Sequence, residues 1–285
     1  MSFVSRIFAL TLIALWLLGC ATEPATTASK PTRIAKAAKG KSKSTKRYLD
    51  IPLETSVGSR FRFPKGARNV DDALYAFAPS ALEQIKPYFR KAGVSYPPND
   101  IVLIAIKDEK KLELWARDTG KYKLVRNYHI KAASGMRGPK LQQGDRQVPE
   151  GIYHISRLNP NSNYHLSMKV DYPNDFDRAH AANDGRYDLG GDIFIHGKAV
   201  SAGCLAMGDA AIEELFVLAA HVGTQNIRVI ISPSDPRERP LDTSHASLPA
   251  WTPELYAEIT REIFSVTQAK PPIKLAHSHI YKRAF

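Results

Sequence analysis

Cysteine is scarce in this chain, since Cys20 and Cys204 are the only two among 285 residues. So few cysteines exclude a disulfide-rich scaffold. Cysteine pairs and histidine pairs at the spacings usual for zinc, C-x2–4-C and H-x3–5-H, are also missing. The histidines considered as ligands are instead spread widely, at His154, His165, His180 and His196. We therefore expect no metal site and no cofactor.

The chain also lacks an apolar run long enough for a comfortable membrane span, which needs about 20 residues. The run over residues 7–18 follows Arg6 and fits the apolar region of a secretory signal. It ends in Leu17-Leu18-Gly19-Cys20, which resembles a bacterial lipoprotein box. This resemblance implies a signal peptide over residues 1–19, lipidation of Cys20 and, because Ala21 follows, sorting to the outer membrane. An ordinary signal peptide or a poor N-terminal anchor is the alternative.

The chain has only 28 Asp and Glu residues against 40 Lys and Arg residues, and its formal net charge is +12. The excess gathers in residues 20–47, which offer almost nothing apolar to bury. From residue 21 onward this segment holds eight Lys and Arg residues against Glu23 alone, which accounts for seven of the twelve charges. Such a composition predicts a disordered tether behind the lipid anchor. Its charge either attracts anionic headgroups or wall polymers or is merely solvated, and nucleic acid is not an expected partner of an exported protein.

The remaining residues are enough for one well-packed domain with additions. Two regions at its ends are expected to be helical. In the N-terminal flank, 48–100, apolar spacing predicts a helix over 71–91, with Pro79 starting or breaking it. In the C-terminal extension, 233–285, the same criterion predicts a helix over 253–267.

Between these flanks, residues 101–232 are predicted to form the central domain. Alternating or continuous apolar runs predict strands over 101–106, 110–117, 124–130, 151–156, 193–196 and 226–232. A helix is expected over 208–221, directly after the second cysteine. We therefore expect a mainly β domain with helical additions at both ends.

One histidine and one cysteine stand at the two ends of a glycine-containing turn. His196-Gly197 follows a short apolar run, and Ser201-Ala202-Gly203-Cys204 precedes the helical pattern. A thiol attacks as thiolate, and a neighbouring imidazole takes its proton and later returns it to a leaving group. Glycine lets backbone N–H groups approach a developing oxyanion. A Cys–His acyl-transfer enzyme is the leading hypothesis, and packing in the core is the alternative for both side chains.

Two segments resemble the YkuD-type L,D-transpeptidase catalytic domain. Residues 138–153 are similar to that family's G-P-K-x-x-x-G-D-x-x-x-P-E-G-x-Y pattern, and residues 196–204 to its H-G…S-x-G-C pattern. The short His-to-Cys spacing, Ala202 and Ala206 depart from the common pattern and resemble the YafK branch. The resemblance implies a YkuD-like antiparallel β-sandwich with a helix after the cysteine loop.

The resemblance and the chemistry together imply acyl transfer on peptidoglycan stem peptides, with a thioester on Cys204. His196 would serve as base and then acid, and the backbone carbonyl of Gly197 would orient its imidazole. Backbone N–H groups around Gly203 and Cys204 would bind the oxyanion. The residues expected to bind substrate are Ser201, Arg137, Lys140 and Arg178. Further candidates beside the site are Arg146, Tyr164, His165 and Tyr172.

The second half-reaction stays open at this stage. An amine acceptor gives cross-linking or protein attachment, whereas water gives hydrolysis. A short loop between His196 and Cys204 predicts an open cleft, so an amidase that releases a peptidoglycan-linked protein is the main alternative. A non-catalytic wall-binding lipoprotein is a third hypothesis. In each case we expect an exported, periplasmic protein held to the membrane by lipid, with a role in cell wall biogenesis and cell shape.

Overall fold

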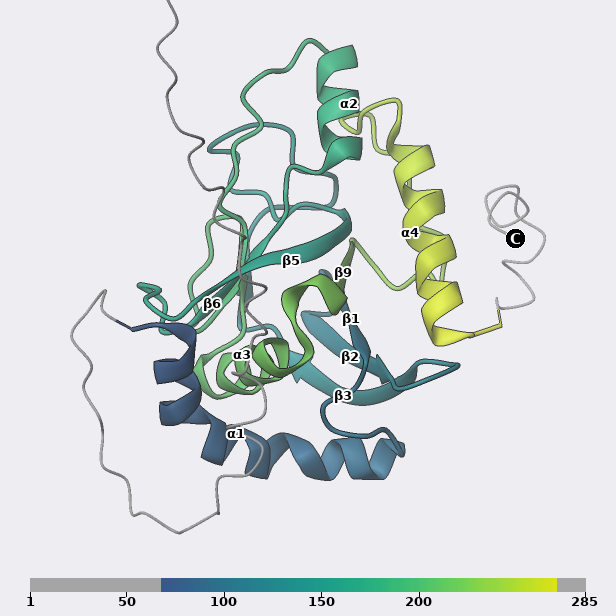
Figure 1. Ribbon diagram of the computed structural model, residues 1–285. Coiled ribbons are helices and arrows are strands. Elements are labelled where there is room, and N and C mark those ends of the chain that lie inside the picture. Colours follow the sequence, from purple (N-terminus) through teal and green to yellow (C-terminus); the bar gives the residue numbers. More distant parts are fainter. Residues whose placement is uncertain (1–67, 271–285) are drawn as a thin grey trace, which may run out of the picture. The chain divides into compact units, whose positions relative to one another are not determined.

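The computed structural model describes residues 68–270, so the predicted signal peptide, Cys20 and the tether lie outside the described residues. The described chain forms nine strands and four α-helices (Figure 1). The strands are β1 Asp100–Ile106, β2 Lys111–Arg117, β3 Lys123–His129, β4 Ala132–Ala133, β5 Gly151–Asn159, β6 Ser167–Val170, β7 Phe194–His196, β8 Leu205–Ala206 and β9 Ile227–Ser232. The helices are α1 Val70–Ala92, α2 Asp175–Asn183, α3 Asp209–Val222 and α4 Thr252–Thr267. Within the described range, no helix has the length and apolar character needed to cross a membrane.

The strands follow the order β3-β2-β1-β9-β5-β6-β7-β8-β4. Strand β5 joins the two halves of this order, because its first residues pair with β9 and the rest with β6. A register shift between Ile155 and Arg157 marks the change of partner, and such irregularities bend a strand. The expected mainly β fold with helical flanks is confirmed.

Most strand pairings are antiparallel, as expected, but two are parallel, so the sheet is mixed. Strand β1 runs parallel to β9, and β7 runs parallel to β8. Side chains alternate between the two faces of a strand whether its neighbour is parallel or antiparallel. The sequence of one strand therefore does not reveal how its neighbour runs.

Strand β1 lies at the centre of the core and is buried on both faces. Ile101, Leu103 and Ala105 pack in the cluster that includes residues of α1 and α3. Their alternates, Val102, Ile104 and Ile106, pack in the cluster that includes residues of α4. Helices α1 and α3 therefore cover one face of this part of the sheet and α4 covers the other (Figure 1). This double burial explains why β1 reads as a continuous apolar run.

The helix expected over 71–91 is α1, and the prediction that Pro79 starts or breaks it is wrong. Both Pro79 and Pro87 lie inside one continuous helix. Asn69 and Asp72 form a capping box at its start, and Gly93 ends it in the left-handed region with φ of 63°. A proline removes one backbone hydrogen bond. The two caps and the buried apolar face of α1 outweigh that loss.

Helix α2 was not predicted from the sequence. It is short, and it carries only two buried side chains, Asp177 and Ala181. Asn174 and Asp177 form a capping box that starts it. Its C-terminal end meets the segment before α4, where the Trp251 indole donates to Asp184 Oδ2 at 3.0 Å and stacks on His180. Helix α2 thus depends on contacts from a distant segment more than on its own apolar pattern.

Candidate active site

The pairing of β7 with β8 brings His196 and Cys204 to adjacent strands inside the sheet, next to the edge strand β4. His196 ends β7, and Cys204 directly precedes β8. The two strands run parallel, with Ile195 opposite Leu205 and His196 opposite Ala206. The backbone N–H of Met207, just after β8, donates to the carbonyl oxygen of His196 at 2.7 Å and adds a further hydrogen bond between the two segments. Two residues that are eight positions apart in the chain are therefore held on neighbouring strands.

The imidazole of His196 is 2 % exposed. Its Nδ1 lies 2.6 Å from the carbonyl oxygen of Gly197. A carbonyl only accepts, so Nδ1 carries the proton and Nε2 keeps its lone pair in the neutral ring. Burial lowers the pKa of His196, and the hydrogen bond to Gly197 partly opposes this shift. The ring is therefore neutral near pH 7, which is the form required of a general base.

The thiol of Cys204 is half-buried, and burial raises its pKa above the ordinary value. The backbone of Phe194 and the charge of Lys140 lower this pKa, whereas Asp192 raises it further. The Sγ atom lies 3.7 Å from the carbonyl oxygen of Asp192. Among the described residues, no hydrogen bond joins Sγ to the imidazole of His196. The resting pair is a neutral thiol beside a neutral imidazole. The structure shows no hydrogen bond between the two groups, and direct proton transfer requires one.

Two serine hydroxyls hold the cysteine loop. Ser201 Oγ donates to the carbonyl oxygen of Cys204 at 2.7 Å and accepts from the Cys204 N–H at 3.2 Å. Ser134 Oγ accepts from the Gly203 N–H at 2.6 Å and donates to the carbonyl oxygen of Arg146 at 2.7 Å. The two N–H groups expected to bind an oxyanion are thus bonded to serine in this structure. Ser134 was missed in the sequence, because no motif marks it and its partner lies 69 residues away.

The glycines of the two motifs are required by their surroundings. A Cβ atom at Gly197 would lie 2.6 Å from the carbonyl oxygen of Tyr164 and 2.7 Å from Asp209 Oδ1. Gly203 has φ of 104°, which L side chains rarely adopt, and its Cβ would lie 3.3 Å from the carbonyl oxygen of Gln147. The segment around Gln147 therefore lies directly beside the cysteine loop.

Tyr164 lies against the imidazole of His196, with ring centroids 4.6 Å apart and planes tilted by 35°. Its own side chain is 43 % exposed. The next residue, His165, has φ of 77°, and its Nε2 lies 2.7 Å from Glu213 Oε1. Tyr172 is buried instead, with its hydroxyl donating to the carbonyl oxygens of Lys140 and Leu189. Among the three aromatic candidates, the structure places the ring of Tyr164 against the imidazole of His196.

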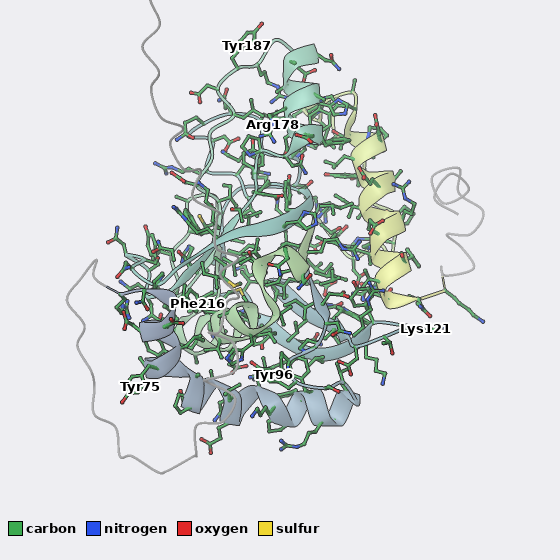
Figure 2. All side chains as sticks on the ribbon, viewed as in Figure 1. Tyr75, Tyr96, Lys121, Arg178, Tyr187 and Phe216 are labelled. Atoms are coloured by element: carbon green, nitrogen blue, oxygen red, sulfur yellow. The ribbon has the colours of Figure 1, made fainter. Side chains whose placement is uncertain are left out.

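The cations predicted to bind substrate are placed differently from one another. Lys140 is buried, and its ammonium donates to the carbonyl oxygen of Gln142 at 2.8 Å and to Asp145. Arg137 is exposed and pairs with Asp108 at 3.4 Å. Arg178 lies on α2 (Figure 2) and contacts Asp175 and the carbonyl oxygen of Pro173 within its own segment. The charge of Lys140 also lowers the pKa of the Cys204 thiol, and substrate binding by each of the three stays a prediction.

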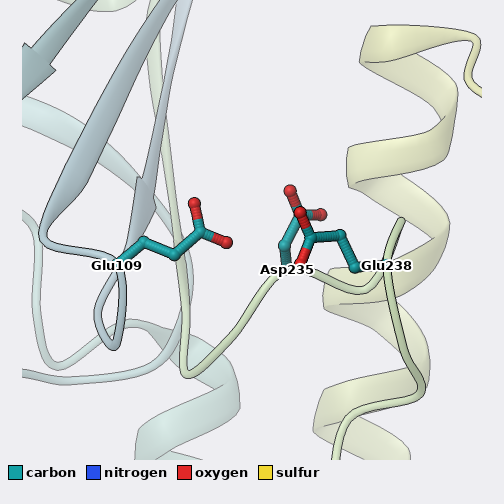
Figure 3. A group of neighbouring side chains, drawn as sticks. All are labelled: Glu109, Asp235 and Glu238. Carbon is teal, nitrogen blue, oxygen red and sulfur yellow. The ribbon is translucent and has the colours of Figure 1, made fainter.

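An acidic cluster lies at the turn between β1 and β2. One carboxylate oxygen from each of Glu109, Asp235 and Glu238 lies within 4.8 Å of the others (Figure 3). The Lys111 ammonium lies 2.5 Å from Glu109 and 4.0 Å from Asp235. Arg237 also donates to Asp235, at 2.7 Å. The cluster is therefore tied into an ion-pair network through Lys111 and Arg237.

Comparison with known proteins finds relatives for the region that holds the site. Residues 99–231 match YkuD, the L,D-transpeptidase catalytic domain. YafK of Escherichia coli K12, whose name assigns it provisionally to the L,D-transpeptidases, is 39 % identical over 132 residues, as is YafK of Escherichia coli O157:H7. These matches cover 45 % of this chain and 51 % of each relative, so the chain spans about half the length of the curated relatives it matches. The resemblance to YkuD-type domains and to the YafK branch is confirmed.

Three solved structures are similar over about half of this chain. The helical cell shape determining protein Pgp2 of Campylobacter jejuni is 23 % identical, with 53 % of this chain and 56 % of that chain covered and a TM-score of 0.40. Bdellovibrio bacteriovorus Bd1075 is 20 % identical, with 49 % and 50 % covered and a TM-score of 0.36. Mycobacterium tuberculosis L,D-transpeptidase 1 is 13 % identical, with 47 % and 62 % covered and a TM-score of 0.28.

Proposed function

We propose that the YkuD-type L,D-transpeptidase catalytic domain over residues 99–231 transfers acyl groups of peptidoglycan stem peptides through a thioester on Cys204. The observation that carries the proposal is the fixed tautomer of His196. Its Nδ1 proton is hydrogen-bonded to the Gly197 carbonyl, so the lone pair that can act as a base is on Nε2. The ring stands on β7, which pairs with β8, the strand that directly follows Cys204.

The proposed reaction begins with transfer of the Cys204 proton to Nε2 of His196. The thiolate then forms a C–S bond with the substrate carbonyl, and negative charge develops on the carbonyl oxygen. The imidazolium returns its proton to the leaving amine as the C–N bond breaks, which leaves the thioester. An incoming amine or water then loses a proton to His196 and attacks the thioester. Breakdown of that second tetrahedral species restores the thiol.

The oxyanion needs donors that the resting loop does not offer freely. The N–H groups of Gly203 and Cys204 are bonded to Ser134 and Ser201. Their use in catalysis requires that the substrate oxygen replace a serine hydroxyl. We expect this exchange to accompany substrate binding, because one N–H does not donate fully to two acceptors at once.

A hydrolytic second half-reaction is the other candidate. The loop between His196 and Cys204 is short, and its residues Lys198, Ala199, Val200 and Ala202 are exposed. An open loop admits a bulky peptidoglycan-linked protein to the thioester, and it admits water as well. Water prevails unless an amine is held close and oriented. Transpeptidation stays our first choice on the strength of the family, with release of a linked protein second.

The test is to incubate the purified protein with muropeptides, with and without a protein-linked species, and to identify products by mass. We expect an acyl adduct on Cys204 and new cross-linked products, and neither from Cys204→Ala. Release of protein without any cross-link would favour the amidase. Turnover by Cys204→Ala would overturn the proposal, and a wild type without adduct or product would favour a wall-binding protein.

We also propose that Cys20 is lipidated and anchors the domain at the outer membrane. The support is the run Leu17-Leu18-Gly19-Cys20 and the polar, basic segment after it. Fractionation of cells that make wild type or Cys20→Ser tests this. We expect the variant to leave the membrane fraction, and unchanged membrane association would show that lipidation is the wrong explanation.

A further inference from the structure

A buried carboxylate links helix α4 to the segment beside the cysteine loop. The side chain of Glu150 is fully buried, and both of its oxygens are used. Oε1 accepts from the Lys107 ammonium at 2.8 Å and from the Gly138 N–H at 2.9 Å. Oε2 accepts from the hydroxyl of Tyr256 at 2.7 Å. Tyr256 belongs to α4, which lies outside the region matched by the family.

The same ammonium holds the segment that follows β4. Besides Glu150, Lys107 donates to the carbonyl oxygens of Met136 at 2.9 Å and Val148 at 3.1 Å. The Gln147 amide closes the loop, because its Nε2 donates to the carbonyl oxygens of Met136 and Gly138, each at 2.6 Å. Residues 134–150, here called the loop segment, are therefore tied together around one buried ion pair.

The loop segment in turn holds the cysteine loop. Ser134 Oγ accepts from the Gly203 N–H, and its backbone N–H donates to Ser201 Oγ at 3.2 Å. The Gln147 carbonyl oxygen packs against Gly203. A continuous set of hydrogen bonds and packing contacts thus runs from Tyr256 through Glu150 and Gln147 to the backbone next to Cys204.

We infer that Tyr256 is a positioning residue: through Glu150, helix α4 fixes the loop segment beside Cys204, which makes the C-terminal extension part of the catalytic unit. The inference deepens the proposed acyl transfer and rests on it for its activity measurement. The physical reason is that Glu150 has no access to water. Without the Tyr256 hydroxyl, Oε2 is a buried charged acceptor without a donor, and the segment must shift or open to satisfy it.

The test variant is Tyr256→Phe, which keeps the ring and removes only the hydroxyl. Its matched control is Ile263→Val, because Ile263 is buried in the same cluster on the same helix and its side chain makes no polar link to Glu150. Amide hydrogen exchange over residues 134–150, measured without substrate, is the first readout. We expect it to rise at least about tenfold in Tyr256→Phe, as the loss of a hydrogen bond to a charged group predicts, and to stay unchanged in the control.

Two further measurements separate positioning from general loss of stability. The rate of Cys204 acylation by a stem peptide is expected to fall about 10- to 100-fold in Tyr256→Phe, because a misplaced site loses orientation. Alkylation of Cys204 by iodoacetamide is expected to change less than about twofold, because β7 and β8 pair without α4. Unchanged exchange over 134–150, or equal acylation losses in both variants, would overturn the inference. Failure of the wild type to form an adduct would overturn the proposed function instead, and the exchange measurement would still decide the role of Tyr256.

Discussion

Two buried histidines, His196 at the end of β7 and His221 on α3, have similar burial and different surroundings. They are 2 % and 9 % exposed, and burial lowers the pKa of both. Nδ1 of His196 donates to the carbonyl oxygen of Gly197, and Cys204 directly precedes the neighbouring strand β8. His221 Nδ1 lies 2.9 Å from the hydroxyl of Tyr96, and its Nε2 is buried with no partner among the described residues. Burial and a lowered pKa therefore do not identify a catalytic imidazole, whereas its neighbours do.

The surroundings of His221 favour a structural role. Tyr96 lies beside α1 (Figure 2), and its ring packs edge-on against both Phe89 and His221. Burial raises the pKa of Tyr96, and the charge of Lys86 adds to the lowering at His221. The contact joins the end of α3 to the turn after α1. We expect substitutions of His221 to lower the stability of the fold and substitutions of His196 to lower the rate of catalysis.

The largest expected difference between the two histidines is in reaction rate. His196→Ala should slow acylation of Cys204 about 10²- to 10⁴-fold, the usual contribution of a general base. His221→Leu should stay within about twofold of wild type when both are assayed well below their melting temperatures. Mass spectrometry of the thioester over time measures both. Equal rates in the two variants would remove the distinction between the sites.

The next effect comes from the residue that orients the imidazole. Gly197→Ala should lower acylation more than about tenfold and destabilise the fold by about 1–3 kcal/mol, because the added methyl group overlaps Tyr164 and Asp209. Gly191→Ala is the matched control, since its Cβ would meet nothing within 4 Å and its φ is not positive. Thermal melts and the thioester assay report the two effects. A Gly197→Ala protein with normal rates would show that the carbonyl does not need its present position.

Stability should fall in mild acid because of both histidines. Their pKa values in the folded protein lie below the unfolded value of about 6.5, so the unfolded chain binds more protons in that window. The free energy of unfolding therefore decreases as pH falls below about 6.5, and the loss stops growing below the folded-state pKa values. Urea melts at a series of pH values measure this. His221→Leu should flatten the dependence, and an unaltered slope would mean that His221 is not one of its sources.

The smallest effect concerns Tyr164, which covers His196. Tyr164→Ala should expose the imidazole and raise its pKa toward the ordinary value, so the acid limb of the acylation rate moves to higher pH. We expect a rate loss of only a few-fold, the order of one aromatic contact. Tyr164→Phe should keep the wild-type profile because the ring remains. A shifted profile in the Phe variant would assign the effect to the hydroxyl rather than to the ring.

Much of the fold was predictable because its signals are local. The helix over 71–91 has its caps and its apolar period within one segment, and the meander over β1, β2 and β3 joins neighbours in the chain. The continuity of α1 through Pro79, helix α2 and the parallel pairings were not predictable. Each depends on packing against residues far away in the sequence, as Trp251 shows for α2.

The residues of the candidate site likewise fall into those that a local motif predicts and those that only distant contacts bring together. The sequence by itself determined that His196 and Cys204 flank a turn that needs glycine, because reactive side chains and glycines are visible in any motif. Only the tertiary structure decided that Ser134 holds the Gly203 N–H, that Tyr164 covers the imidazole and that Tyr256 reaches Glu150 from outside the family region. These contacts join residues that are between 32 and 106 positions apart. The order and direction of the strands set which of them meet, and a polar side chain in one segment gives no sign of the buried partner that it will satisfy.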